Sequence, residues 1–439
     1  MAATREQERS ASGLVATPAR YGKLSPGPGM PAVEVEAHQR ARLQAGMVEL
    51  AGSEGYGAVT VRRLSQIAGV STRTFYEHFQ GKDECLLSTC DLIVECAVGR
   101  LTALQSEPDW RERLRRVIAE LADGVAAQAL AARLILIEAP AAGLGQAHRI
   151  EGICEVVLSD CFSDSRMPPM LLRGITSGVL SVVQARLLAG EEHELPDLVD
   201  ELVTWARSLS DLSGAELAKL DRQSKPAKQP PRPDRPTVKG WNSEGENKDG
   251  RRLLLAAAAR LATSRNYQQL TTVDIRAAAG VSRRSFDSHF DSAGDCFRAA
   301  LEVRISDAFE YAVQQAPGRI WAEDVHRTIS SLCWQMAGDP MLASPGSQSL
   351  FTEGPGGPRS QNRMKTFAAE RFRASAPSPF ERPKQAVAEA SVGAVWGLLL
   401  HDAPQRPRQI PLIISWSSYI MLAPTMGACA ALQVAGSRD

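Results

Sequence analysis

The sequence is poor in aromatic residues, which form 5% of it, and it contains no Cys-x-x-Cys pair. It also lacks net charge, because 50 basic residues offset 50 acidic ones. A polycationic tail protein is therefore excluded, whereas a DNA-binding protein with a local basic face is not. Ala and Leu recur throughout and favour helices over strands. With 44% hydrophobic residues over 439 positions, we expect an all-α protein of two or three globular domains.

The eight cysteines are scattered, and a chain of this length can build its cores without disulfides. We therefore expect a reducing compartment in which the cysteines are small buried hydrophobic residues; a redox-sensing thiol is the alternative. The sequence has no GxGxxG after a strand, no GxxxxGK[ST], no GxSxG and no HExxH. His148, His193, His326 and His401 have no Cys or carboxylate at metal-ligand spacing. We predict no enzymatic activity, no cofactor and no metal.

The two ends of the chain are candidates for targeting and membrane segments. Residues 1–35 are predicted to form a disordered arm, because they are polar, rich in Gly and Pro, and lack the apolar core of a secretory signal. Residues 409–437 carry no charge, which allows a transmembrane interpretation, but Pro411 and Pro424 interrupt the segment. We expect a cytoplasmic protein associated with the nucleoid and no membrane partner.

A repeat organises the chain. Residues 60–85 (TVRRLSQIAGVSTRTFYEHFQGKDEC) and 271–296 (TTVDIRAAAGVSRRSFDSHFDSAGDC) are identical at ten of 26 positions, with a fixed offset of 211. Near the ends of the two halves, at an offset of 215, Gly178 aligns with Gly393 and Pro196 aligns with Pro411. Each proline is expected in the first turn of a terminal helix. The apolar tail is therefore predicted to be the buried last helix of a second repeat.

A linker separates the two repeats. Residues 224–240 (SKPAKQPPRPDRPTVKG) contain five prolines and five basic residues against one Asp, which is typical of a solvated tether; contact with DNA phosphates is the alternative. The predicted boundaries are a first DNA-binding domain at 36–100, a first helical regulatory domain at 101–210, the linker at 211–249, a second DNA-binding domain at 250–311 and a second regulatory domain at 312–436.

Each repeat carries the pattern of a helix-turn-helix. A helix over 36–52, or 250–264 in the second copy, comes first. Thr60 then caps a short helix, Gly69 ends it with a positive φ, and Ser71 caps the third helix. The apolar residues expected to face inward are Val61, Leu64, Ile67, Phe75 and Phe79. The third helix is left to protrude, in the manner of a recognition helix that enters a major groove.

The exposed polar residues of this pattern are candidates for DNA contact. Thr72, Arg73 and Thr74 are expected to read base edges, and an Arg can bind guanine O6 and N7 in bidentate fashion. Phosphates are expected to accept hydrogen bonds from the flanking side chains. The full set of candidate DNA-contacting residues is Thr60, Arg62, Ser71, Thr72, Arg73, Thr74, Tyr76, His78 and Lys82 in the first copy, and Thr271, Ser282, Arg283, Arg284, Ser285 and His289 in the second.

The pattern T…L..IAGVS.RTFY.HF.GKDE closely resembles the DNA-binding domain of tetracycline-repressor-type (TetR/AcrR) transcriptional regulators, over residues 40–100 and 251–311. The resemblance implies that the helices downstream of each copy enclose a small-molecule pocket and build a four-helix interface. Trp110, Phe162, Trp321 and Trp334 are the candidate pocket residues, with plain core residues as the alternative. The resemblance predicts a ligand-responsive regulator, most simply a repressor; a ligand-binding or adaptor protein with a degenerate second helix-turn-helix is the alternative.

The second copy differs at positions that would meet DNA. It has Asp287 and Ala293 where the first copy has Tyr76 and Lys82, but its recognition helix starts with two arginines. Residues 250–297 carry seven Arg and four Asp, whereas 36–85 carry six basic and six acidic residues. The second copy is therefore expected to prefer a different half-site or to act as a nonspecific phosphate clamp.

The family's subunits pair through their last two helices. Their two helix-turn-helix domains, which we call readers, then meet successive major grooves about 34–36 Å apart. In this chain the resemblance implies that 170–209 could pack against 383–422 as a covalent pseudo-dimer. A linker of about 39 residues spans roughly 35 Å when relaxed, so the geometry is permitted. The operator would then be asymmetric. A homodimer of tandem chains with four readers is the alternative.

Overall fold

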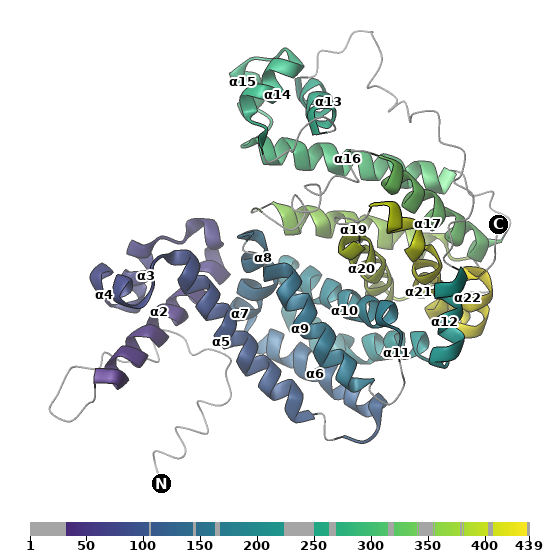
Figure 1. The fold of residues 1–439 in the computed structure, drawn as a ribbon, viewed down its shortest axis with the longest axis horizontal. Helices are drawn as coiled ribbons and strands as arrows, with labels where there is room; N and C mark the ends of the chain where they lie inside the picture. The colour runs from purple at the N-terminus through teal and green to yellow at the C-terminus, as the bar shows by residue number, and fades with distance from the viewer. Residues whose placement is uncertain are drawn as a thin grey trace. The chain divides into compact units, whose positions relative to one another are not determined.

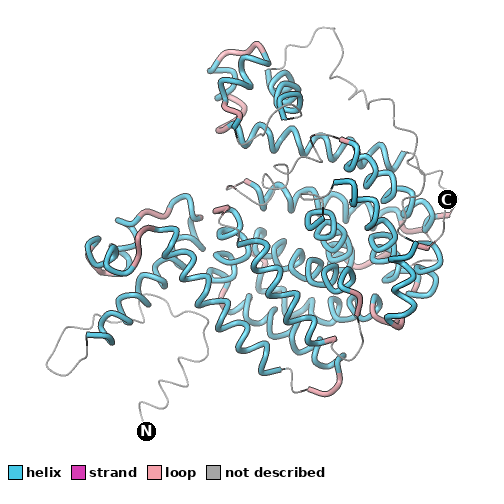
Figure 2. The backbone as a smooth tube through the Cα atoms, in the orientation of Figure 1, coloured by secondary structure: helices cyan, strands magenta, loops and turns pink. Residues whose placement is uncertain are grey.

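The computed structural model describes residues 32–104, 107–143, 146–162, 167–223, 250–262, 269–314, 320–339, 341, 354, 356–377, 380, 382–402 and 407–436 (Figure 1). Within these ranges every regular element is a helix, as Figure 2 shows, which confirms the all-α prediction. The chain forms two compact units, Met1–Cys161 with Val183–Asp200 and Phe162–Val182 with Glu201–Asp439. The units do not coincide with the two sequence repeats, because the division between them falls inside the helices α10 and α11 of the first repeat.

The first unit begins with the helices of the first repeat. Its elements are α2 (Ala32–Glu54), η2 (Tyr56–Ala58), α3 (Val61–Ala68), α4 (Thr72–His78), α5 (Lys82–Ala103), α6 (Trp110–Ala127), α7 (Ala129–Arg133), η4 (Leu134–Glu138), α8 (Ala139–Ala141), α9 (Gln146–Cys161), the end of α10 (Pro169–Ala189) and η5 (Glu192–Leu198). Leu43, Met47 and Leu50 lie at helical spacing along α2 and are almost fully buried. Because α2 contacts both α3 and α5, this apolar stripe is the core that holds the small domain together.

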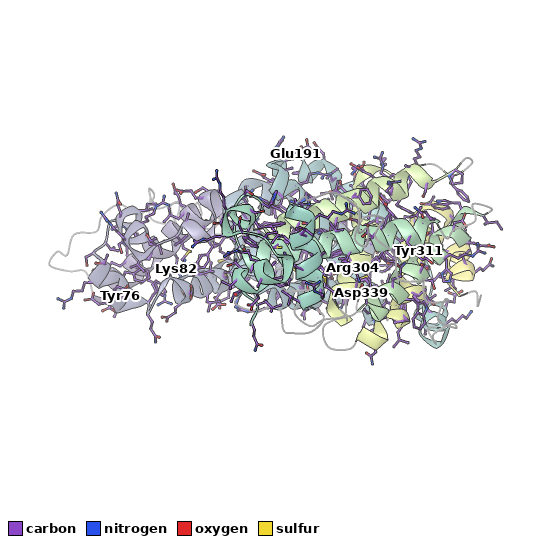
Figure 3. All side chains as sticks on the ribbon, turned by 90° about the horizontal axis from the view of Figure 1, so that it is seen from above. Tyr76, Lys82, Glu191, Arg304, Tyr311 and Asp339 are labelled. Carbon is purple, nitrogen blue, oxygen red and sulfur yellow. The ribbon has the colours of Figure 1, made fainter. Side chains whose placement is uncertain are left out.

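The second unit contains the start of α10, most of α11, the helix α12 and all helices of the second repeat. The helices after α10 have the following bounds: α11 (Val199–Leu209), α12 (Gly214–Gln223), α13 (Gly250–Ala262), α14 (Thr272–Ala279), α15 (Arg283–Asp287), α16 (Ala293–Gln314), α17 (Trp321–Gly338), α19 (Gly357–Ser375), α20 (Gln385–Asp402), η7 (Pro407–Ile413), α21 (Ile414–Met426) and α22 (Ala428–Ala435). Arg304 on α16 and Asp339 after α17, both labelled in Figure 3, form an ion pair that joins these two helices.

Within the second unit, α10 and α11 of the first repeat meet α20 and α21 of the second; we call this contact the seam. Small residues let the helices approach closely. A Cβ placed on Gly393 or Gly397 of α20 would collide with Ser181 or Ser177 of α10. The seam therefore joins the two halves of the sequence through backbone-close packing rather than through long side chains.

Two buried hydrogen bonds cross the seam. Trp205 of α11 donates its indole N–H to Ser391 Oγ of α20 at 3.0 Å, and Tyr419 of α21 donates its hydroxyl to the Leu209 carbonyl oxygen at 3.0 Å. Both aromatic side chains are at most 1% exposed. Each hydrogen bond satisfies a buried polar atom that would otherwise have no partner. Because breaking either bond would leave such an atom unpaired, the two bonds fix the relative orientation of the helices.

The apolar tail is part of this core. All residues from Ile414 to Ala423 are buried in α21, so the predicted burial of the tail is confirmed, but α21 is not the last helix, because α22 follows it. Within the described residues, one helix is long and apolar enough to span a membrane; it is α10, and most of it is buried inside the protein. Its apolar surface is thus accounted for by the protein core.

Several local predictions differ from the structure. Pro196 and Pro411 lie inside the 3₁₀ segments η5 and η7, which precede α11 and α21, and not in the first turn of an α-helix. The linker predicted to start at residue 211 begins with α12, because Leu217 and Leu220 are buried in the second unit. Ile67, expected to face inward, is 37% exposed.

The cysteines predict a specific order of chemical labelling. All eight are free thiols; Cys429 is exposed, whereas burial raises the pKa of Cys85, Cys90, Cys296 and Cys333 to about 12. The expectation that all of the cysteines are buried is thus wrong for Cys429, and Cys96 and Cys154 are only half-buried. At pH 8 a buried thiol with this pKa has roughly three orders of magnitude less thiolate than an ordinary one. A thiol-specific disulfide reagent is expected to label Cys429 first, and Cys429→Ser removes this phase. An equally fast phase left in that variant from one of these four buried cysteines would contradict the prediction.

Candidate nucleic-acid interface

The two helix-turn-helix domains share the same backbone devices. Thr60 caps α3 by accepting a hydrogen bond from the Arg63 N–H at 3.3 Å, and Thr271 caps α14 in the same way from Asp274. Gly69 and Gly280, at φ 61° and 66°, end these helices in the left-handed conformation. Because a left-handed residue is cheap only for glycine, the repeated Gly fixes the turn in both copies.

The recognition helices also begin alike. Ser71 Oγ accepts the Thr74 N–H at 3.0 Å at the start of α4, and Ser282 Oγ accepts the Ser285 N–H at 3.2 Å at the start of α15. These hydroxyls satisfy backbone donors that the first turn leaves unpaired. Ser71 and Ser282, both predicted DNA contacts, thus already serve as helix caps in the protein alone.

Two buried phenylalanines, which we call the aromatic anchor, hold the inner face of each recognition helix in the core of its domain. Phe75 and Phe79 are at most 1% exposed, and their ring centroids lie 5.8 Å apart; Phe286 and Phe290 repeat the arrangement at 5.9 Å. This buried pair holds one face of the helix inside the domain. The opposite face is consequently free to meet a partner.

An arginine of the first helix covers each anchor and lies outside the aligned segments 60–85 and 271–296. The Arg40 guanidinium lies 4.6 Å from the Phe79 ring centroid, and that of Arg251 lies 5.6 Å from the Phe290 centroid. Arg40 also donates a hydrogen bond to Ser88 Oγ at 2.8 Å. The two arginines are 211 positions apart, which is the offset between the repeats. Extending the alignment of the repeats upstream would therefore have identified both of them.

The free face of α4 carries most of the predicted contacts. Thr72, Arg73 and Tyr76 are exposed there, Thr74 is half-buried and bonded to Ser71, and Arg62 is exposed on α3. Arg73 extends into solvent with 91% of its side chain exposed and forms an ion pair with Glu77, one turn later, at 3.2 Å. Glu77 was absent from the predicted site. An exposed Arg–Glu pair at i, i+4 contributes little to stability, but Glu77 is an acceptor that a base edge has to replace before Arg73 can read it.

Tyr76 lies on this face and Lys82 lies at the start of α5; Figure 3 labels both side chains. Tyr76 is 60% exposed, and its ring meets the Phe75 ring edge-on with centroids 5.4 Å apart. Lys82 donates to the Val59 carbonyl oxygen at 3.2 Å, and its ammonium lies 4.4 Å from the Tyr56 ring centroid. These contacts hold the ammonium in place beside the reading face.

His78 does not project toward the reading face as predicted. It is half-buried, and its Nε2 forms a hydrogen bond with Gln39 Oε1 of α2 at 3.2 Å. Burial, and secondly the charge of Arg40, lower the pKa of His78 below its ordinary value, so the neutral ring is favoured. The side chain therefore ties α4 to α2. In the second copy the corresponding His289 is exposed.

The second reading face is chemically different. α15 spans Arg283–Asp287 and ends at Ser288, whereas α4 continues to His78. Arg283 pairs with Asp287 at 3.4 Å, but Arg284, which corresponds to Arg73, has Ser288 where Arg73 has Glu77. Within the described residues, Arg284 has no acidic partner. The recognition helix of the second copy thus carries an uncompensated guanidinium, whereas that of the first copy does not.

The residues beside α15 change as well. Thr271 is exposed and forms a capping box with Asp274, in which each side chain accepts a hydrogen bond from the other residue's backbone N–H. Ser285 is half-buried. Val273, which corresponds to Arg62, is 64% exposed, and Ala293 occupies the place of Lys82. An exposed valine offers no hydrogen bond to a phosphate. The second domain therefore keeps the scaffold of the first and loses its flanking cations.

The four candidate pocket residues are placed in different surroundings. Phe162 is 2% exposed and Trp110 is half-buried with the Arg111 guanidinium 4.6 Å from its ring. Trp321 is committed to a stack on Phe372 and donates to Ser375 Oγ at 3.0 Å. Trp334 is the one of the four whose buried indole N–H has no hydrogen-bond partner in the described part of the chain. That the four line a ligand pocket stays a prediction.

Comparison with known proteins agrees with the geometry. The model of the family "Bacterial regulatory proteins, tetR family" matches residues 45–89 and 254–300, which contain both helix-turn-helix domains. No curated protein matches the chain. Among solved structures, the transcriptional regulator FadR from Bacillus subtilis in complex with stearoyl-CoA is similar, with 17% identity over 38% of this chain and 96% of that one and a TM-score of 0.34. Two family matches on two domains with the same caps, turns and anchors show that the chain carries two DNA-binding domains of the TetR family in tandem.

Proposed function

We propose that the chain is a transcriptional repressor whose two non-identical readers bind one asymmetric operator, and that a small-molecule effector releases it. The observation that carries this proposal is the exposed recognition helix found twice on the same scaffold, with Arg73 on one copy and Arg283 and Arg284 on the other. Both copies retain their caps, their positive-φ glycine and their aromatic anchors. An adaptor with degenerate readers would not need to keep an exposed basic face on either copy.

The seam supports a pseudo-dimer within one chain. The family pairs two subunits through the last two helices, and here the corresponding helices of both repeats already contact each other within the second unit. The same surfaces are then unavailable to a second chain. We therefore favour one chain with two readers over a homodimer with four.

Contacts inside the first unit offer a route from the regulatory helices to the first reader. Arg133, at the end of α7, donates to the Gly52 carbonyl oxygen at 3.1 Å and to the Leu187 carbonyl oxygen at 2.5 Å. At the other end of the π-helical turn η4, Glu138 accepts the Tyr56 N–H at 2.8 Å. Both ends of η4 thus hold the chain between α2 and α3. A ligand that shifted η4 would move the reader with it, because π-helical turns often mark functional sites.

The second unit has a comparable contact. Arg298 of α16 is 9% exposed, forms an ion pair with Asp295 at 2.7 Å and lies against Gly354 and Gly356. On the next turn Glu302 binds Ser360 and Arg363 of α19. The start of α16, which follows the second reader directly, is thereby joined to α19. By linkage, an effector that changes this contact and DNA would weaken each other's binding by the same factor.

Genomic fragments are expected to test the function directly. The full chain should enrich specific fragments from fragmented genomic DNA, with affinity that falls steeply with salt. Arg73→Ala with Arg284→Ala should abolish the enrichment, because each Arg lost from a base contact costs about 1–3 kcal/mol. Arg115→Ala with Arg116→Ala, which removes two exposed arginines of α6 outside the readers, is the matched control and should bind normally. Unchanged affinity and salt dependence in the first double variant would refute DNA binding by these readers.

A further inference from the structure

We infer that the two readers divide their tasks: the first holds the DNA backbone, and Arg284 of the second supplies most of the sequence discrimination. The inference rests on the proposed function, because it presupposes that the chain binds an operator. It goes further by assigning opposite roles to two domains that share one scaffold. It also selects between the two roles left open for the second copy, a base reader and a nonspecific phosphate clamp.

The first step concerns the cations beside each reading face. The first reader has Arg62, exposed on α3, and Lys82, whose ammonium is positioned by the Val59 carbonyl oxygen and the Tyr56 ring. The second reader has Val273 and Ala293 at these positions. Each phosphate contact made by a cation contributes about 0.9 to the dependence of log K on log salt. The second reader lacks both of these contributions, which argues against a clamp.

The second step concerns the hydroxyl of Tyr76, which is replaced by the carboxylate of Asp287. Tyr76 is 60% exposed and can donate to a phosphate oxygen. Asp287 is an acceptor only, and its side chain is 60% exposed. A carboxylate at this position repels the DNA backbone unless Arg283, 3.4 Å away, compensates its charge. Arg283 thereby has an acceptor on its own helix, and Arg284 is the arginine of the two that has none within the described residues.

The third step concerns the free arginine. Arg73 shares its charge with Glu77 at 3.2 Å, whereas Arg284 has a serine one turn later and no acidic partner within the described residues. Arg284 is exposed on a helix whose other side is fixed by the buried Phe286. A free guanidinium on a fixed helix has the fork geometry that binds guanine O6 and N7. The second half-site is therefore expected to require a guanine opposite Arg284.

The experiment compares two duplexes with the full chain. One is a duplex of about 30 base pairs, long enough for two successive half-sites, cut from the genomic fragment that the wild type enriches most. The other has the same bases in scrambled order. Arg62→Ala with Lys82→Ala is expected to weaken binding to both duplexes by the same factor and to reduce the salt slope by about two.

Arg284→Ala is expected to behave in the opposite way, with about a 5- to 150-fold loss on the operator duplex and little change on the scrambled one. Arg284→Lys is the charge-matched control: it keeps the positive charge but lacks the planar fork, so it should retain the scrambled-duplex affinity and still lose discrimination. Val273→Arg with Ala293→Lys should add affinity for both duplexes and raise the salt slope.

The outcomes separate the inference from the function on which it rests. Equal losses on both duplexes in Arg284→Ala, with full recovery in Arg284→Lys, would show a phosphate clamp and overturn the inference while DNA binding stands. A larger loss of discrimination from Arg73→Ala than from Arg284→Ala would overturn it as well. A wild-type chain that binds neither duplex would refute the proposed function itself.

Discussion

Replacing Gly393 and Gly397 by alanine together is expected to lower the free energy of unfolding by about 2–6 kcal/mol, since overpacking costs about 1–3 kcal/mol at each site. A Cβ at either position would collide with the Cβ of Ser181 or Ser177 on α10. These serine atoms sit close to their own backbone and cannot rotate away. The helices α10 and α20 would have to move apart, and buried contacts of the seam would be lost along their length.

A helical glycine without neighbours is the matched control. A Cβ added to Gly99 of α5 or Gly152 of α9 would meet no side chain and no neighbouring helix within 4 Å. Alanine at these positions should stabilise the protein by about 0.5–1 kcal/mol, because glycine is costly in a helix interior. Urea unfolding followed by circular dichroism measures all three variants. Ser181→Gly added to Gly393→Ala should recover part of the loss, as expected of two residues in contact.

The mass of the wild-type protein in solution tests the pseudo-dimer. The wild type should sediment as a single chain of 47.4 kDa in dilute solution. A mass of about 95 kDa, twice the chain mass, would contradict the pseudo-dimer and favour the homodimer with four readers. The seam would not be formed in solution if the variant with both Gly393→Ala and Gly397→Ala had the same free energy of unfolding as the Gly99→Ala control.

The helix-turn-helix domains could be predicted from the sequence because their devices are local. A Thr, a Gly and a Ser at fixed spacing determine a cap, a turn and a second cap within twelve residues, and two phenylalanines define the buried face. The same locality explains why the first helix of each copy was predicted near its observed position. Periodic apolar residues decide which face of a helix is buried without reference to its partner.

What escaped the sequence depends on contacts between distant segments. The burial of α12 is decided by α21 and α22, which lie about 200 residues further on, and a short amphipathic segment after a regulatory domain gave no sign of them. The position of His78 is set by Gln39 on another helix. The pairing of Gly393 with Ser181 follows from how two helices cross, which periodicity does not specify.

The early end of α15 is an intermediate case. Ser288 occupies the position of Glu77 and turns its hydroxyl back to the Ser285 carbonyl oxygen at 2.8 Å. Serine competes with the backbone for such hydrogen bonds and is a poor residue for a helix interior. The substitution was visible in the aligned repeats, but its effect on helix length depends on the neighbouring turn. The same change removes the acidic partner of Arg284, so one residue alters both the length and the charge of the reading face.

Trp205→Ala is expected to cost about 3–5 kcal/mol of stability, the usual range for removing a fully buried tryptophan. The Trp205 ring lies against Gly178, where a Cβ would collide with it, and its N–H binds Ser391 at 3.0 Å. The side chain therefore fills the space between α10, α11 and α20 and pairs a buried hydroxyl. Trp110→Ala is the comparison variant, because Trp110 is half-buried at the start of α6 and should cost less.

Two milder variants separate packing from hydrogen bonding at Trp205. Ser391→Ala leaves a buried indole N–H unpaired and should cost about 1–3 kcal/mol, whereas Trp205→Phe keeps an aromatic ring but no longer donates to Ser391. If the bond is formed, the two changes combined cost less than their sum. Additive effects, or a loss below about 1 kcal/mol in Trp205→Ala, where a filled core position predicts about 3–5, would mean that the indole does not lie buried against α20. The two repeats would then not be joined by the seam, and the two readers would be tethered by the linker alone.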